Sequence, residues 1–98
     1  MFVRVWLVDP IEPDRERFEQ AYGPDGDWAR LFALGDNYLG TELLRGEPGK
    51  YLTIDRWRGE ADWQRFMDRN GDSYRALDRA CEDLTADESE IGAFSRSA

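Results

Sequence analysis

Histidine is missing from this 98-residue chain, and cysteine occurs only once. Without histidine, the chain lacks the one side chain whose ordinary pKa lies near neutrality, and it cannot complete a Cys/His zinc site. The single cysteine, Cys81, cannot form a disulfide within the chain. We therefore expect no bound metal, no nucleophile–histidine pair, and a reducing compartment.

Long apolar runs and basic charge are also scarce. No apolar run approaches the length of a membrane span, and the first residues, 1–6, lack the basic segment and long apolar core of a signal peptide. The formal net charge is -8, from 21 acidic against 13 basic residues, so nucleic acid and anionic membranes would be repelled. The chain is expected to be soluble and cytoplasmic, with no nucleic-acid and no membrane partner.

The length of the chain suits one domain spanning residues 1–98, because a smaller second core could hardly exclude water. A domain of this size buries only about 60–65% of the surface that its unfolded chain exposes. An apolar interface with a second copy would add to that burial. A homodimer is therefore expected.

Residue patterning predicts the elements in order. Strands are expected at 2–8, 38–45 and 50–57. A weaker strand is expected at 88–95, either at a sheet edge or exchanged between the subunits of a dimer. Apolar residues at helical spacing predict one broken helix or two short ones over 13–35, and helical segments at 60–68 and after Asn70-Gly71. Gly35 stands where a left-handed residue would end the first helical region. This order is the split βαβ arrangement of the ferredoxin-like α+β fold, with an antiparallel four-stranded sheet.

The first and third strands each have two unlike faces, because side chains alternate along a strand. The aliphatic face carries Val3, Val5, Leu7, Leu52 and Ile54. We expect this face to pack against the helices as the core. The opposite face, with Trp6, Tyr51 and Trp57, would then need cover from the sheet of a second copy. Two such sheets would form a dimeric α/β barrel around an aromatic and polar cavity.

Three segments resemble the antibiotic biosynthesis monooxygenase (ABM) domain family: 28–32 (WARLF), 38–44 (YLGTELL) and 51–57 (YLTIDRW), followed by Glu60-Ala61 and Phe66. The resemblance extends over about residues 18–66, and its most specific element is the Trp that ends a strand just before a helix. It implies a dimeric α/β barrel with a pocket between the sheet and the helices of each subunit. It also implies that some members oxidise electron-rich aromatic polyketides with O2, without metal or flavin.

Related members degrade haem, generally with an Asn on the first strand, the strand-end Trp and a helix His that binds iron. Here Trp57 occupies the Trp position, and Phe66 stands close to the His position. The first strand offers Arg4 and Trp6 instead of Asn. Haem degradation is therefore disfavoured, and no cofactor is expected.

Four residues are candidates for substrate positioning and hydrogen bonding: Tyr51, Trp57, Arg4 and Asn37. Trp57 either forms a pocket wall for a planar ligand or anchors the strand to the next helix. Tyr51 either donates to a substrate oxygen or lies in the barrel interface. Arg4 either stabilises a phenolate or superoxide-like charge, or pairs with an acidic neighbour such as Asp55. Asn37 either binds a carbonyl or belongs to a turn.

Three further residues are interpreted as core. Cys81 lies on an apolar helical stripe, which predicts a buried thiol rather than a nucleophile. Trp28 and Trp63 lie on similar stripes, which favours packing over pocket lining.

Two functions remain open. The first is a cofactor-independent monooxygenase that oxidises a small electron-rich aromatic substrate with O2. The alternative is a non-catalytic dimeric α/β barrel that binds a small hydrophobic ligand, since a shared fold does not settle function.

Overall fold

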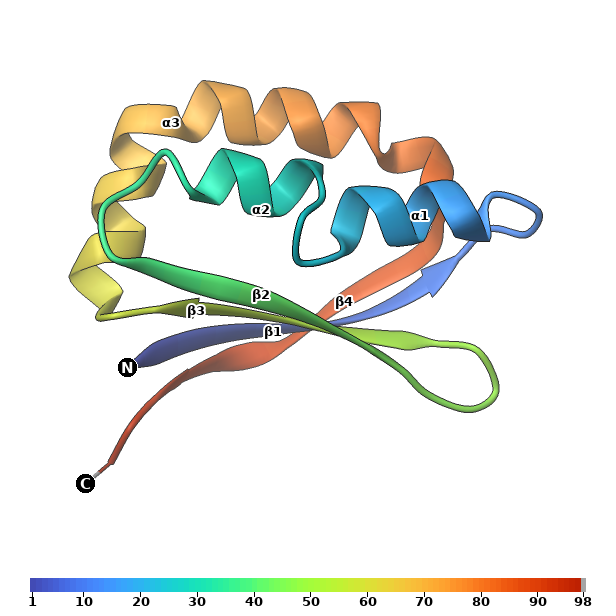
Figure 1. Cartoon of the computed structure of the whole chain (residues 1–98), viewed down its shortest axis with the longest axis horizontal. Helices are drawn as coiled ribbons and strands as arrows, with labels where there is room; N and C mark the ends of the chain where they lie inside the picture. The colour runs from blue at the N-terminus through green and yellow to red at the C-terminus, as the bar shows by residue number, and fades with distance from the viewer. Residues whose placement is uncertain (98) are drawn as a thin grey trace.

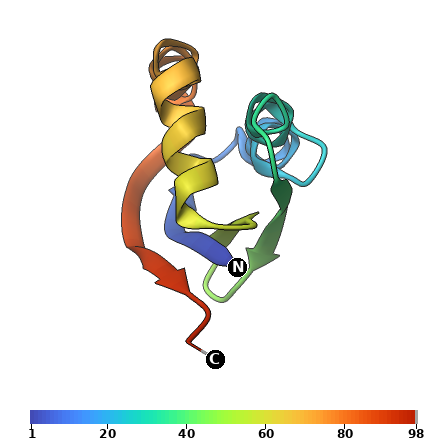
Figure 2. The same ribbon diagram turned by 90° about the vertical axis from the view of Figure 1, so that its left-hand side faces the viewer.

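The sheet has four antiparallel strands, and all helices lie on one of its faces (Figures 1 and 2). The computed structural model describes residues 1–97. The elements in chain order are β1 (Phe2–Pro10), α1 (Arg15–Tyr22), α2 (Asp27–Phe32), β2 (Tyr38–Arg45), β3 (Tyr51–Trp57), α3 (Glu60–Ala80), a 3-10 turn η1 (Glu82–Leu84) and β4 (Thr85–Ser95). The strand order is β2-β3-β1-β4. The expected ferredoxin-like α+β fold is confirmed.

The helices follow the sequence pattern closely. The segment expected to be one broken helix or two short ones forms α1 and α2, separated at Gly23–Gly26. The two later helical segments form one long helix, α3, which is kinked at Asn70, where φ is -125° and ψ is 17°. The last strand, β4, lies at a sheet edge as expected and pairs with β1 of its own chain. Among residues 1–97 no helix is both long and apolar enough to cross a membrane.

The assignment of the two sheet faces from sequence was wrong. Tyr51 and Trp57 point toward the helices and are 2% and 0% exposed, while the aliphatic residues Val3, Val5, Leu7, Leu52 and Ile54 are partly exposed on the open face. Aromatic side chains bury the larger apolar area, so covering their face removes more apolar surface from water. The larger buried apolar surface area therefore explains why the helices cover the aromatic face, even though that face also carries polar groups.

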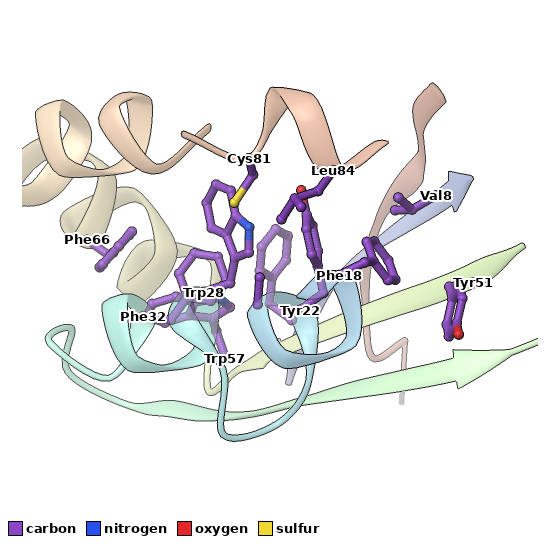
Figure 3. Packing of buried hydrophobic residues seen from close by; sticks show 12 residues of the cluster. Val8, Phe18, Tyr22, Trp28, Phe32, Tyr51, Trp57, Phe66, Cys81 and Leu84 are labelled. Carbon is purple, nitrogen blue, oxygen red and sulfur yellow. The ribbon is translucent and has the colours of Figure 1, made fainter. Parts of the chain in front are cut away.

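The core between helices and sheet is mainly aromatic (Figure 3). Phe18 stacks on Tyr22, with ring centroids 4.5 Å apart. Phe32 meets Trp57 and Phe66 edge-on, at 5.8 Å and 5.4 Å. These geometries are the favourable ones for aromatic pairs. They fix α2 and the start of α3 against the end of β3.

Gly35 serves this packing and has no left-handed backbone, contrary to the expectation from sequence. A Cβ at this position would lie 3.0 Å from Phe66 Cδ1 and 3.0 Å from Trp57 Cζ3. The left-handed residue of the turn into β2 is instead Asn37, with φ 63°. Gly35 is thus required because two rigid rings approach the backbone.

Candidate functional site

A cavity of about 390 Å³ lies between the sheet and the helices of the single chain. This volume falls within the range usual for small-molecule sites. Its apolar walls are formed by Trp6, Val8, Tyr22, Trp28, Phe32, Met67 and Tyr74. Its polar lining consists of Arg4, Thr41, Thr53, Asp55, Asp78 and Glu88. The position agrees with the pocket that the ABM resemblance implies, and not with a cavity between two sheets.

The sheet supplies a polar floor centred on Asp55. Thr41 on β2 pairs across the sheet with Asp55 on β3, and the Thr41 hydroxyl donates to Asp55 Oδ1 at 2.7 Å. Asp55 is only 9% exposed, and burial raises its pKa to about 6, against smaller lowering effects of the Thr41 hydrogen bond and the Arg4 charge. Asp55 is therefore a carboxyl group that exchanges a proton near neutrality.

Arg4 lines the cavity beside this floor, directly opposite Asp55 in the register of β1 and β3. Its Nε and Nη2 donate to Oε2 of Glu90 on β4 at 3.0 Å and 2.5 Å. The guanidinium carbon also lies 4.4 Å from the ring centroid of Trp63, a cation–π contact. Glu90 and Trp63 together hold the guanidinium at the cavity wall.

A second acidic region lies at the other end of the cavity. Glu88 pairs with Val8 near the end of β1, and the Tyr22 hydroxyl donates to Glu88 Oε1 at 2.9 Å. Partial burial and the negative charges of Asp78 and Asp87 raise the pKa of Glu88. Burial likewise raises the pKa of the Tyr22 and Tyr74 phenols. These phenols stay protonated, and the Tyr22 phenol acts as a hydrogen-bond donor.

Of the four residues proposed from sequence, Arg4 alone lines this cavity. Tyr51 packs against Phe18, and its hydroxyl donates to Glu19 and accepts from Arg15 Nη1 at 3.3 Å. Tyr51 is therefore neither in the cavity nor on the open sheet face. The inward face of β3 is long, and helix α1 covers the end that carries Tyr51.

Trp57 also lies outside the cavity, enclosed by Phe32, Tyr38, Trp63 and Phe66. Its indole N–H is buried and has no hydrogen-bond partner among residues 1–97. The geometry matches the packing alternative for Trp57.

Asn37 forms the turn before β2, as its flanking residues indicated. Its carbonyl accepts from the Arg58 N–H, and its Nδ2 donates to Asp62 Oδ1 at 2.9 Å. This hydrogen bond is the largest of the effects that lower the pKa of Asp62. Asn37 thus joins the start of β2 to the first turn of α3, away from the cavity.

The sequence interpretation overlooked Asp55, Thr53 and Thr41 as site residues. Asp55 and Thr53 alternate with the outward-facing Leu52 and Ile54, so they share the inward face of β3 with Tyr51 and Trp57. The same period-two pattern could have pointed to them, once that face was assigned to the helices.

The residues present do not fit a haem ligand set. Phe66, which stands near the His position of the haem-degrading relatives, is 1% exposed and packed in the core. The two tyrosines of the cavity have raised pKa values, which disfavours the phenolate that iron would need. The buried Cys81, as expected, is a small core residue whose thiol pKa is raised by burial. Among residues 1–97, no group of three or more His, Cys, Asp or Glu side chains is placed to hold a metal ion.

Among known proteins, this chain is similar to others in structure but not in sequence. No family model and no curated protein matches the sequence. SnoaB, a cofactor-independent oxygenase from Streptomyces nogalater, superposes with a TM-score of 0.72 at 20% identity, over 99% of this chain and 93% of that one. The chain has the fold of this oxygenase.

Two other solved structures share it. A Nitrosomonas europaea protein provisionally named an antibiotic biosynthesis monooxygenase has a TM-score of 0.69 at 11% identity, with both chains fully covered. MhuD, solved with two manganese protoporphyrin IX molecules per active site, has a TM-score of 0.70 at 16% identity, over 100% of this chain and 96% of that one. The ABM-type fold implied by the resemblance is confirmed.

Proposed function

We propose that this protein is a cofactor-independent monooxygenase of the ABM type, which oxidises a small electron-rich aromatic substrate with O2 in the cavity between sheet and helices. The observation that carries the proposal is the buried Asp55 carboxyl, with a pKa of about 6, in an aromatic-walled cavity of about 390 Å³. The similarity of the fold to SnoaB supports the same chemistry.

In the proposed reaction, Asp55 acts as the general base. It removes a proton from an activated CH2 group of the substrate, and the resulting carbanion transfers one electron to O2. The substrate radical and superoxide then combine, forming a C–O bond and a peroxide that takes the proton back from Asp55. Loss of water from this hydroperoxide leaves a C=O group, so one oxygen atom of O2 enters the product and the other enters water.

Arg4 stabilises negative charge in this sequence. Two of its guanidinium nitrogens, Nε and Nη2, donate to Glu90, and the third, Nη1, does not. A fixed cation next to the cavity stabilises both the carbanion and superoxide. The aromatic walls exclude water, which strengthens that interaction. The protein thus supplies a base, a fixed positive charge and a cavity with aromatic walls.

Oxygen uptake with anthrone-type substrates tests the proposal. Loss of a general base lowers rates by about 10²–10⁴-fold, so we expect such a loss in Asp55→Asn. The wild-type rate should rise with pH through about 6, and this inflection should vanish in the variant. Tyr51→Phe, which lies outside the cavity, is the matched control and should keep the wild-type rate. Equal rates in wild type and Asp55→Asn would refute the role of Asp55.

The second candidate is a non-catalytic protein that binds a small hydrophobic ligand. One observation favours it. Glu90 already binds two of the three guanidinium nitrogens of Arg4, so less of the Arg4 charge is free to stabilise a reaction intermediate. Saturable binding of an aromatic probe, with oxygen uptake at the background rate for every hydroxyarene tested, would support this candidate over the oxygenase.

We further propose that the protein forms a homodimer through the open sheet face. This face carries the aliphatic side chains of β1 and β3, together with Leu44 and Phe94, which are 42% and 50% exposed. A contiguous apolar face of this kind is seldom left in water by a monomer. Light scattering at tens of micromolar should give twice the chain mass, and Ile54→Arg should give the monomer mass. A wild-type monomer at that concentration would contradict the dimer.

A further inference from the structure

Negative charge dominates the lining of the cavity. Three carboxylates line it, from Asp55, Asp78 and Glu88, against the single guanidinium of Arg4. Arg4 forms a salt bridge with Glu90, whereas none of the three lining carboxylates has a cation within salt-bridge distance among residues 1–97. The lining therefore carries more negative than positive charge, with Asp55 buried and with Asp78 and Glu88 exposed to solvent, and this balance favours a cationic ligand.

The charges lie at two ends of the cavity. Asp55 and Arg4 face each other across β3 and β1, while Glu88 pairs with Val8, four residues further along β1. Four residues of strand span about 13 Å. Glu88 is thus offset by about 13 Å along the strand direction from Asp55, the residue that can remove a proton. Asp78 on α3 also lines the cavity, and its negative charge acts on Glu88.

The aromatic walls between these ends are suited to a cation as well as to a planar ring. Trp28 and Tyr74 meet edge to face, with centroids 5.0 Å apart, and both line the cavity. Cations bind to the faces of such rings. One ring of the cavity wall already makes such a contact, since the Arg4 guanidinium carbon lies 5.6 Å from the ring centroid of Trp6.

We propose that the cavity takes an amine-bearing aromatic ligand, whose ammonium group lies between Glu88 and Asp78 and whose reactive ring lies beside Asp55. This inference rests on the proposed function and names its substrate class. A carboxylate-bearing aromatic of the same size would face the two acidic side chains and be repelled. Discrimination by charge thus comes from the end of the cavity with Glu88 and Asp78, and chemistry comes from the end with Asp55.

Calorimetric titration with three probes of one shape tests this assignment: naphthylethylammonium, naphthylethanol and naphthylacetate. We expect the ammonium probe to bind about tenfold or more tightly than the alcohol, in line with a cation–π contact and an adjacent carboxylate. The acetate should bind more weakly than the alcohol. The preference for the ammonium should shrink as salt is added.

A double variant, Glu88→Gln with Asp78→Asn, should lose the preference for the ammonium and keep the affinity for the alcohol. Asp87→Asn is the matched control, because Asp87 neighbours Glu88 on β4 but does not line the cavity; it should bind the probes as wild type does. The inference is overturned if the acetate binds as tightly as the ammonium, if none of the probes binds, or if the double variant keeps the preference.

The two proposals fail in different ways. Oxygen uptake with neutral hydroxyarenes, together with no preference for the ammonium probe, would refute the amine and leave the oxygenase. Preference for the ammonium probe, without oxygen uptake on any aromatic amine or hydroxyarene, would refute the oxygenase and leave an amine-binding site.

Discussion

Arg4 faces Asp55 across the central pair of strands, yet its guanidinium is bound to Glu90 on the other neighbouring strand, with Nη2 2.5 Å from Oε2. The Arg4 charge lowers the pKa of Asp55 less than burial raises it, and the pKa stays at about 6. Had Arg4 paired directly with Asp55, that carboxyl would be a weak base locked as an anion. Because Arg4 pairs with Glu90, the pKa of Asp55 stays in the range in which the carboxyl can act as an acid or a base.

Asp55→Asn should stabilise the protein near neutral pH. Because burial raises the folded-state pKa from 3.8 to about 6, folding favours the protonated carboxyl. Its contribution to stability is fully present below pH 3.8 and is lost as pH rises through about 6. Asn mimics the protonated form and can still accept from Thr41. Urea unfolding at pH 7.5 should show a gain of about 3 kcal/mol, by the relation between a pKa shift and free energy.

At pH 4 the two proteins should differ much less, because folded wild type already carries the proton. Protein concentration must be the same in all samples, since a dimer gains stability by mass action. A wild type more stable than Asp55→Asn at pH 7.5 would show that Asp55 is not held in a costly ionised state.

Gly35→Ala should destabilise the fold although Ala is the smallest change available. The added Cβ would lie 3.0 Å from a Phe66 ring atom and 3.0 Å from a Trp57 ring atom, and both rings are rigid and buried. Overpacking of this kind costs about 1–3 kcal/mol. Gly46→Ala is the matched control, because its Cβ would meet only Lys50 O at an ordinary 3.6 Å. Thermal unfolding of both variants would separate crowding from a general cost of replacing glycine.

Trp57→Ala should lose about 3–5 kcal/mol of stability, the usual cost of deleting a buried aromatic side chain. Trp57→Phe should lose clearly less, because it keeps a ring and removes the buried N–H that has no partner. Unfolding in urea measures both. If folded Trp57→Phe keeps the wild-type rate of oxygen uptake, Trp57 acts through packing; a large fall in rate with unchanged stability would restore a role in the site.

Tyr51→Phe should cost about 0.5–1.5 kcal/mol, the net value of a typical hydrogen bond, through loss of the hydroxyl contacts with Glu19 and Arg15. Probe binding should not change, because Tyr51 does not line the cavity. Urea unfolding and calorimetry on the same preparation give both quantities. A weaker binding constant at unchanged stability would mean that the cavity reaches further along β3.

The sequence predicted the order of the elements because that order depends on local signals. The Gly and Pro residues at 46–49 mark the turn between β2 and β3, and Asn70-Gly71 marks the kink of α3. Which face of β1 and β3 packs against the helices depends on the side chains that the helices contribute to the contact. The large rings of Phe32, Trp63 and Phe66 settle it, because they pack against Trp57. No pattern within a single strand contains that information.

The site was predictable only in part, for the same reason. Arg4 was found because an arginine in an otherwise apolar strand stands out. Asp55 was weighed only as a partner for Arg4, since one carboxylate among 21 acidic residues has no distinctive spacing. Its importance comes from being buried beside Thr41, which depends on the pairing of β2 with β3.

The kink of α3 at Asn70 divides the helix into two parts that differ in burial (Figure 1). The part before it carries the buried Phe66 into the aromatic core, while residues 72–80 after it are all partly or fully exposed. Because less of the second part is buried, amide hydrogens after residue 71 should exchange faster than those of 62–69. A ligand could then enter through transient opening of the second part, at a free-energy cost well below that of global unfolding.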